Sequence, residues 1–193
     1  MAVPSLTQCY QLMERYRMLP NIRRHSIVVA RVAELLVDTL PPKLELPDRN
    51  RVVAGALLHD IAKTPCLDNG CEHALLGAVL CEEHGFHEIA PCVAEHVLLK
   101  HHEPQRYARG HFLAREIVYY ADKRVRHDQV VSLEERLDYI IKHYGNNDPL
   151  RHRLIRENFQ KCIDLEQHLF QWLDFPPEAV PEIIACGKRN LAT

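Results

Sequence analysis

Apolar residues spaced three and four apart recur along most of the 193 residues, and prolines separate the runs. This spacing places apolar side chains on one face of an α-helix, whereas a half-buried strand would need strict alternation. One clear run holds Ile22, His25, Val29, Val32 and Leu36. No segment of useful length alternates as a strand would, and the sequence has no internal repeat. The sequence therefore predicts an all-α protein of about eight or nine helices.

Local signals predict where these helices begin and end. Asn21 can cap the second helix, Gly85 suits a helix C-terminus, and Ser132 with Glu135 forms a capping box. We expect loops over 64–70 and 100–110. We expect helices over 6–18, 21–40, 48–63, 71–83, 91–100, 112–125, 132–144 and 147–173, and a short terminal helix among prolines 176, 177 and 181.

The composition is that of an ordinary globular protein, with 47% hydrophobic and 26% charged residues. A net charge of -2 argues against a protein that coats nucleic acid or a membrane surface, because no large basic field is available. A small anionic ligand needs only local charge. Since no stretch approaches the apolar length of a membrane span, we expect a cytoplasmic protein. The oligomeric state is left open, because apolar faces of the late helices suit either a dimer or the core.

The seven cysteines indicate free thiols rather than disulfide bonds or a metal site with thiolate ligands. Their number is odd and no two form a C-x-x-C pair. We therefore expect free, largely buried thiols in a reducing compartment.

Six ionisable residues fall on apolar helix faces, in a chain with thirteen histidines. A single histidine on such a face is more often a hydrogen-bonded core residue than a ligand. A buried carboxylate without a cation, however, costs several kcal/mol. One shared cation would lower that cost for all of them. The six are His25, His59, Asp60, His73, His96 and Asp122.

The types of these side chains indicate the kind of metal. Imidazoles and carboxylates without thiolates suit Fe, Mn, Co, Ni or Zn rather than Ca or Mg. Six ligands exceed what one catalytic ion needs, since positions must stay open for water and substrate. Two divalent ions fit better, and Asp60 is the natural bridge between them because it has two oxygens and follows His59.

The same residues resemble the H…HD…D signature of the HD superfamily of metal-dependent phosphohydrolases. Residues 57–63 resemble its HDIG-type core motif, with Ala62 in place of the glycine. His73, Gly77 and His96 resemble the additional elements of members that hold two metals. Residues 121–125 and 132–136 look like a bacterial branch of the family. The resemblance covers about 21–144, and it implies one HD-type helical bundle over 1–193, with further helices in 148–190.

The resemblance implies a ligand set for each ion. His25, His59, Asp60 and Asp122 would hold the first, while His73 and His96 would hold the second with Asp60 bridging. His101 or His102 could replace His96, because cyclic-dinucleotide phosphodiesterases of the superfamily carry paired histidines. The glycine-tyrosine-proline signature of that branch is missing here, and His101 and His102 fall in a polar stretch, which favours His96.

We predict hydrolysis of a phosphomonoester or phosphodiester by metal-activated water. The favoured substrate is a nucleotide. Asp60 and Lys63 are the catalytic candidates, and Lys63, Lys123, Arg124 and Arg126 are candidates for binding the phosphoryl oxygens. A solvated helix end explains the basic run over 123–127 equally well. The expected partner is a small phosphorylated substrate, without a large nucleic acid or a membrane.

The types of the metal ligands alone do not distinguish hydrolysis from two other functions. Some proteins of the HD fold use a di-iron site with the same ligand set to oxidise a C–H bond. A non-catalytic nucleotide-binding module could also retain the site, although it would not need Lys63 beside the metals.

Overall fold

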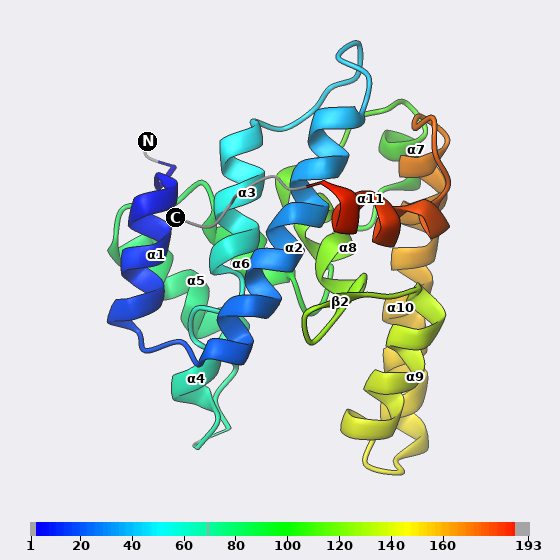
Figure 1. Cartoon of the computed structure of the whole chain (residues 1–193). Coiled ribbons are helices and arrows are strands. Elements are labelled where there is room, and N and C mark those ends of the chain that lie inside the picture. Colours follow the sequence, from blue (N-terminus) through cyan, green and yellow to red (C-terminus); the bar gives the residue numbers. More distant parts are fainter. Residues whose placement is uncertain (1–2, 69, 188–193) are drawn as a thin grey trace.

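Helices make up nearly all of the regular structure in a computed structural model, which describes residues 3–68 and 70–187 (Figure 1). The prediction of an all-α protein is therefore confirmed. The only strands within the described residues form a ribbon of two residues each, β1 (Val125–Arg126) and β2 (Gln129–Val130), paired antiparallel. The helices are α1 (Leu6–Arg15), α2 (Pro20–Thr39), α3 (Arg49–Leu58), α4 (Lys63–Cys66), α5 (His73–Glu83), α6 (Ala90–Glu95), α7 (Pro104–Tyr107), α8 (Ala114–Lys123), α9 (Leu133–Tyr144), α10 (Pro149–Phe170) and α11 (Val180–Cys186), with a 3-10 turn η1 (Pro177–Ala179) before α11.

Two single-turn helices lie where the sequence predicted loops. Both α4 and α7 have four residues, too few for a periodic apolar pattern. In α7, Pro104 occupies the first turn, where its missing N–H costs nothing. These short helices account for the difference between eight or nine predicted helices and those observed.

The predicted end signals are largely those the helices use. The side chain of Ser132 accepts a hydrogen bond from the N–H of Glu135, and the side chain of Glu135 accepts one from the N–H of Ser132. Gly85 takes φ +79° after the end of α5. Asn21, however, does not cap α2. The helix begins at Pro20, because proline is tolerated in a first turn. Asn21 therefore lies inside α2, one turn before His25.

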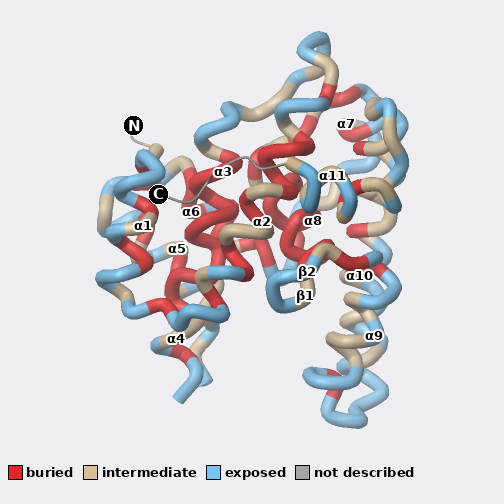
Figure 2. The backbone as a smooth tube through the Cα atoms, viewed as in Figure 1, coloured by how far each residue is buried: buried red, intermediate tan, exposed pale blue. Residues whose placement is uncertain are grey.

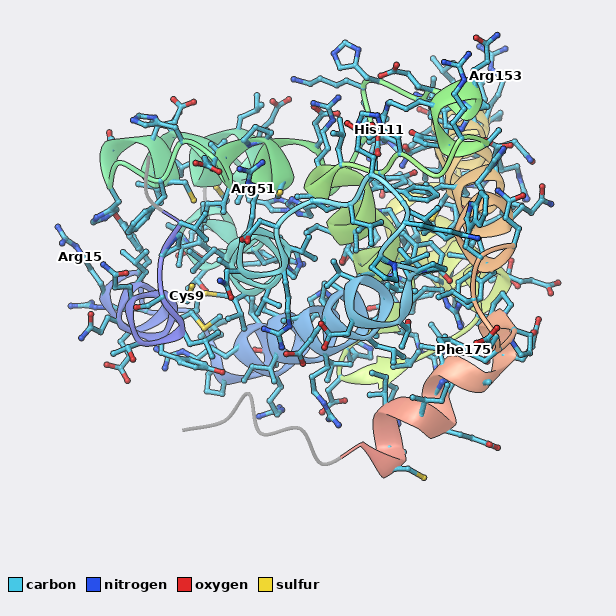
Figure 3. All side chains as sticks on the ribbon, turned by 90° about the horizontal axis from the view of Figure 1, so that it is seen from above. Cys9, Arg15, Arg51, His111, Arg153 and Phe175 are labelled. Atoms are coloured by element: carbon cyan, nitrogen blue, oxygen red, sulfur yellow. A yellow bond between two sulfur atoms is a disulfide. The ribbon has the colours of Figure 1, made fainter. Side chains whose placement is uncertain are left out.

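The core lies where α2 packs on both α3 and α8, with α6 against α3 and α8 (Figure 2). Its side chains include Val29 and Leu36 from α2, Leu57 from α3, and Ile117 and Val118 from α8, all fully buried. Burying a side chain of this size stabilises the fold by roughly 1.5–3 kcal/mol. Seen from above, charged side chains such as Arg15 and Arg153 project from the periphery, whereas Cys9 lies inside (Figure 3).

Helices α9 and α10 form an antiparallel arm beside this core (Figure 1). Leu133 is the only residue of α9 that is buried, and the rest of the helix is exposed or half-buried (Figure 2). The arm therefore leaves one face of α9 free to line a cavity.

The expectation that all cysteines are free is wrong at two positions. Cys66 at the end of α4 and Cys71 before α5 form a disulfide. Their separation of five residues matches no thiol motif, so no local pattern indicates this disulfide. Cys9, Cys81 and Cys92 are buried free thiols, as expected.

No described helix combines the length and the apolar character that crossing a bilayer requires.

Candidate metal centre

His59 and Asp60 lie in a tight turn between α3 and α4, not within a helix as their apolar surroundings predicted. The N–H of Ile61 donates to Leu58 O at 3.0 Å, and the N–H of Lys63 donates to Asp60 O at 2.9 Å. These are bonds between residues three apart, which tighten the end of a helix. His59 and Asp60 are both almost fully buried. In a regular helix the two neighbouring side chains would point about 100° apart. The turn instead directs both of them toward one place.

Three imidazoles are fixed by the backbone in the same way. The Nδ1 of His25 donates to His127 O at 2.8 Å, that of His59 to Ala56 O at 2.7 Å, and that of His96 to Val93 O at 2.7 Å. A carbonyl oxygen only accepts, so each Nδ1 carries the proton. In a neutral ring the Nε2 lone pair is then free. Such a bond to the second nitrogen is the usual support of a metal-bound histidine.

One group of side chains gathers around His25, His59 and Asp122. The Nε2 of His25 lies 3.1 Å from Asp122 Oδ1 and 4.0 Å from Asp60 Oδ2. The Nε2 of His59 lies 3.5 Å from Asp60 Oδ2 and 3.7 Å from Asp122 Oδ1. These side chains come from α2, the turn after α3, and α8. The set is the one predicted for the first ion.

A second group gathers on the other oxygen of Asp60. The Nε2 of His73, the first residue of α5, lies 3.3 Å from Asp60 Oδ1, and that of His96, just after α6, lies 3.4 Å from it. The two Nε2 atoms are 3.2 Å apart. Helix α5 can approach this closely because Gly77 has no side chain: a Cβ there would lie 2.8 Å from Val93 Cγ1. The set is the one predicted for the second ion.

The two rival histidines lie elsewhere. His102 Nε2 is 2.8 Å from Asp164 Oδ2 on α10, and His101 is exposed. Of the three alternatives, His96 is thus the one brought to Asp60.

The donor atoms of the centre fit cations better than they fit one another. Lone pairs of Nε2 atoms face carboxylate oxygens or each other, and such pairs repel unless a proton or a metal lies between them. His59 Nε2 and Asp60 Oδ1 are buried without a hydrogen-bond partner. Ligand atoms at about 2.0–2.2 Å from one ion lie about 3–3.6 Å apart, close to the separations seen here. The geometry yields two candidate clusters, His25 with His59 and Asp60, and Asp60 with His73 and His96.

The protonation states favour metal binding by the carboxylates and by His96. For Asp60, burial acts to raise the pKa, but His59 and Lys63 lower it well below its usual range. Burial also opposes ionisation of Asp122, but the charge of Lys123 holds the pKa of this carboxyl well below its usual range. Burial lowers the pKa of His96 to about 4, so this ring is neutral at pH 7.

His59 behaves differently from His96. Burial acts to lower its pKa, but the charge of Asp60 outweighs this and raises it. Protons therefore compete with a metal at His59 more than at His96.

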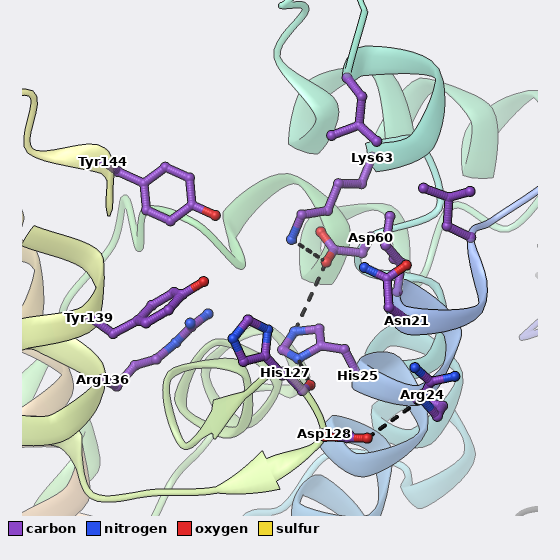
Figure 4. A pocket seen from close by; sticks show the side chains of 13 residues that line it. Asn21, Arg24, His25, Asp60, Lys63, His127, Asp128, Arg136, Tyr139 and Tyr144 are labelled. Carbon is purple, nitrogen blue, oxygen red and sulfur yellow. Dashed lines mark hydrogen bonds and ion pairs between the residues drawn. The ribbon is translucent and has the colours of Figure 1, made fainter. Parts of the chain in front are cut away.

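A cavity of about 280 Å³ opens onto Asp60 and His25 (Figure 4). Lys63 lines it, and its Nζ donates to Asp60 Oδ2 at 2.7 Å. Asn21 and Arg24, which precede His25 on α2, line it as well. Sequence reasoning missed the remaining polar and aromatic residues of the lining, because only the placement of α9 and of the ribbon brings them there. They are His127, Asp128, Arg136, Tyr139 and Tyr144.

The other predicted phosphate-binding residues do not line this cavity. Lys123 is buried, and its Nζ donates to Asp122 Oδ2 at 2.8 Å and to His96 O at 2.7 Å. The buried guanidinium of Arg124 donates to Val131 O, Pro177 O and Glu166. Arg126 lines a separate hollow near β2 and α11. These placements make Lys123 a support of the centre and do not favour Arg124 or Arg126 as substrate ligands.

Comparison with known proteins places the chain among relatives. The family model described as HD domain matches residues 22–174. A tRNA (cytidine(56)-2'-O)-methyltransferase of Picrophilus torridus is 28% identical over 151 residues, which cover 70% of this chain. The chain matches only 40% of the length of that relative. No solved structure matches the chain significantly.

Proposed function

The chain belongs to the HD domain family of metal-dependent phosphohydrolases, and from this premise we propose that it hydrolyses a phosphate ester of a small molecule at a centre of two divalent ions. The favoured small molecule is a nucleotide. His25, His59, Asp60 and Asp122 would hold one ion. Asp60, His73 and His96 would hold the other. The ions would be Fe, Mn, Co, Ni or Zn, since the donors are nitrogens and carboxylate oxygens.

One observation carries the proposal: two sets of donor atoms, all buried except that of the half-buried His73, share Asp60, with one set on each of its oxygens. In a pair of this kind, bound ions activate a water and neutralise charge on the phosphoryl group. A centre open to a cavity on one side leaves room for that group. The cavity reaches both Asp60 and His25.

Lys63 is the residue that we propose acts on the substrate beside the ions. Burial acts to lower its pKa, but the charge of Asp60 outweighs this and raises it, so the ammonium stays protonated. It can therefore stabilise negative charge on a phosphoryl oxygen but cannot serve as a base. Lys123 has a different role, because its bonds to Asp122 and to the carbonyl of His96 tie the two sides of the centre together.

We also propose a small molecule rather than a large nucleic acid as the partner. The name of the Picrophilus torridus relative refers to tRNA, but the match covers only 40% of that protein. The net charge of this chain is -2, and the cavity volume is about 280 Å³. Both features suit a small ligand better than a polyanion.

The test is a screen of phosphate esters with protein loaded with Mn, Co, Fe or Mg, alongside elemental analysis. We expect phosphate release that Asp60→Ala abolishes together with metal binding, while His102→Ala retains both. Phosphate release that survives Asp60→Ala would refute the mechanism. Oxygen uptake by the iron-loaded protein without phosphate release would identify an oxygenase instead.

A further inference from the structure

The side of the cavity opposite Lys63 and Asp60 belongs to α9. Arg136, Tyr139 and Tyr144 line it from this helix, and we name these three residues the α9 wall (Figure 4). None of them belongs to the ligand sets described above. The arm of α9 and α10 therefore contributes a surface to the cavity that metal binding does not explain.

Arg136 has hydrogen-bond donors to spare. Its side chain is only 12% exposed, and its Nη2 lies 3.9 Å from Asp122 Oδ1, beyond hydrogen-bond distance. Its Nε is buried without a partner, and among the described residues its guanidinium makes only this longer ion pair with Asp122 and no hydrogen bond. A guanidinium carries five donors in a planar fork that matches the oxygens of a phosphate. Arg136 thus offers a planar set of donors next to the centre.

The contrast with Arg124 shows what an arginine with a structural role looks like in this chain. Arg124 is also buried, but its guanidinium donates to two backbone carbonyls and to Glu166. Buried polar groups normally find such partners. An arginine that faces a cavity without them is suited to an anion that enters the cavity.

Tyr144 offers a free aromatic face. Its residue is 55% exposed, and none of the ring contacts among the described residues involves it. The ring of Tyr139, in contrast, packs edge-on against His127 at 5.3 Å and stacks on His143 at 4.1 Å. On the α4 side of the cavity, Leu67 is 59% exposed. An aromatic face and an apolar side chain at the same opening suit a flat ring.

Arg136 and Tyr144 are too far apart to hold the same chemical group. Eight residues of helix separate them, which is about 12 Å along the axis. A cavity of about 280 Å³ is near the lower end of the range for ligand sites. It accommodates a phosphoryl group with one ring system attached rather than a dinucleotide.

Resting on the phosphohydrolase function proposed above, we infer that the α9 wall selects the substrate: Arg136 donates to a phosphoryl oxygen, and Tyr144 stacks on a flat ring of the esterified group. The substrate class is a phosphomonoester that carries a single ring system. Lys63 and Arg136 lie on opposite sides of the cavity (Figure 4), so a phosphoryl group bound between them would contact both.

The Arg136 part is tested with inorganic phosphate, by calorimetry on the Mn-loaded protein. Hydrogen bonds to a charged group are worth enough that Arg136→Gln should weaken phosphate binding roughly 10- to 100-fold. Arg136→Lys should restore part of the affinity, and Arg153→Gln, an exposed arginine on α10, should change nothing. Metal content should stay at the wild-type level in all three. Phosphate affinity within twofold of wild type in Arg136→Gln, or a parallel loss of metal, would overturn this part.

The Tyr144 part is tested by comparing nucleoside 5′-monophosphates with ribose 5-phosphate, which lacks the base. Stacking on an aromatic side chain suggests that Tyr144→Ala raises KM about tenfold for the nucleotides and leaves the affinity for inorganic phosphate unchanged. Tyr144→Phe keeps the ring and should match wild type. An equal loss with ribose 5-phosphate, or no loss with any nucleotide, would refute base stacking.

The two proposals fail in different ways. A wild-type protein that binds phosphate but hydrolyses no phosphate ester contradicts the proposed function. The binding of phosphate and of nucleoside monophosphates to the same variants then decides the role of the α9 wall.

Discussion

Replacing Asp60 by asparagine should remove both ions at once, because each of its oxygens faces one group of histidines. The change keeps the size of the side chain and removes its charge. In metal-free protein it leaves the Lys63 ammonium, whose Nζ lies 2.7 Å from Asp60 Oδ2, without a charged partner. Breaking a buried ion pair costs about 3–5 kcal/mol, and we expect about 2–3 kcal/mol here because the Lys63 side chain is 34% exposed and screened by solvent.

The decisive quantity is the stabilisation that metal adds to each variant. An ion at 100 times its dissociation constant adds about 2.7 kcal/mol. For a domain of this size that raises Tm by about 5–11 °C for each ion. The wild type should show the increment of two ions, His73→Ala about half of it, and Asp60→Asn none.

Thermal unfolding with Mn²⁺ and with EDTA measures these increments, and elemental analysis counts the ions. Each variant serves as its own metal-free reference, so the direct cost of the substitution cancels. His102→Ala, whose imidazole pairs with Asp164, should keep the full increment. An Asp60→Asn protein that still binds one ion and gains half of the increment would refute the shared carboxylate.

Three further predictions concern pH, the disulfide and Lys63. Because metal binds neutral imidazole and the pKa of His59 is raised, protons should compete with the ions and lower their occupancy as the pH falls from 7 to 5, and full occupancy at pH 5 by dialysis and elemental analysis would contradict this. Cys71→Ser should cost about 2 kcal/mol, or about 4–8 °C in Tm, because it opens a short loop in the unfolded chain, and reductant should lower the Tm of wild type but not of the variant. Lys63→Met should lower kcat at least about tenfold in steady-state assays while both ions stay bound, and a loss of metal would show that Lys63 instead supports the centre.

The candidate ligand residues could be picked out because their sequence context is unusual. His25 and Asp122 interrupt apolar helix faces, and a buried carboxylate calls for a cation wherever the helix lies. Periodicity and capping likewise located the long helices, as the Ser132 capping box illustrates. Both signals are local, so they survive without knowledge of the tertiary structure.

Other features depend on contacts that the sequence does not reveal. The sequence favoured Arg124 over Arg136 as a phosphate-binding residue, yet Glu166, 42 residues after Arg124, engages Arg124 and not Arg136. The turn at His59 and Asp60 ends α3 within an apolar run that favours a continuing helix. Partners far along the chain decide which arginine side chain faces the cavity, and the periodicity of apolar residues carries no information about those partners.

The most direct test is an anomalous difference map from crystals of the metal-loaded protein. Two peaks are predicted, one among His25, His59 and Asp122 and one between His73 and His96, with a different oxygen of Asp60 contacting each. A single peak that Asp60 does not touch, or ions bound away from these side chains, would contradict the account.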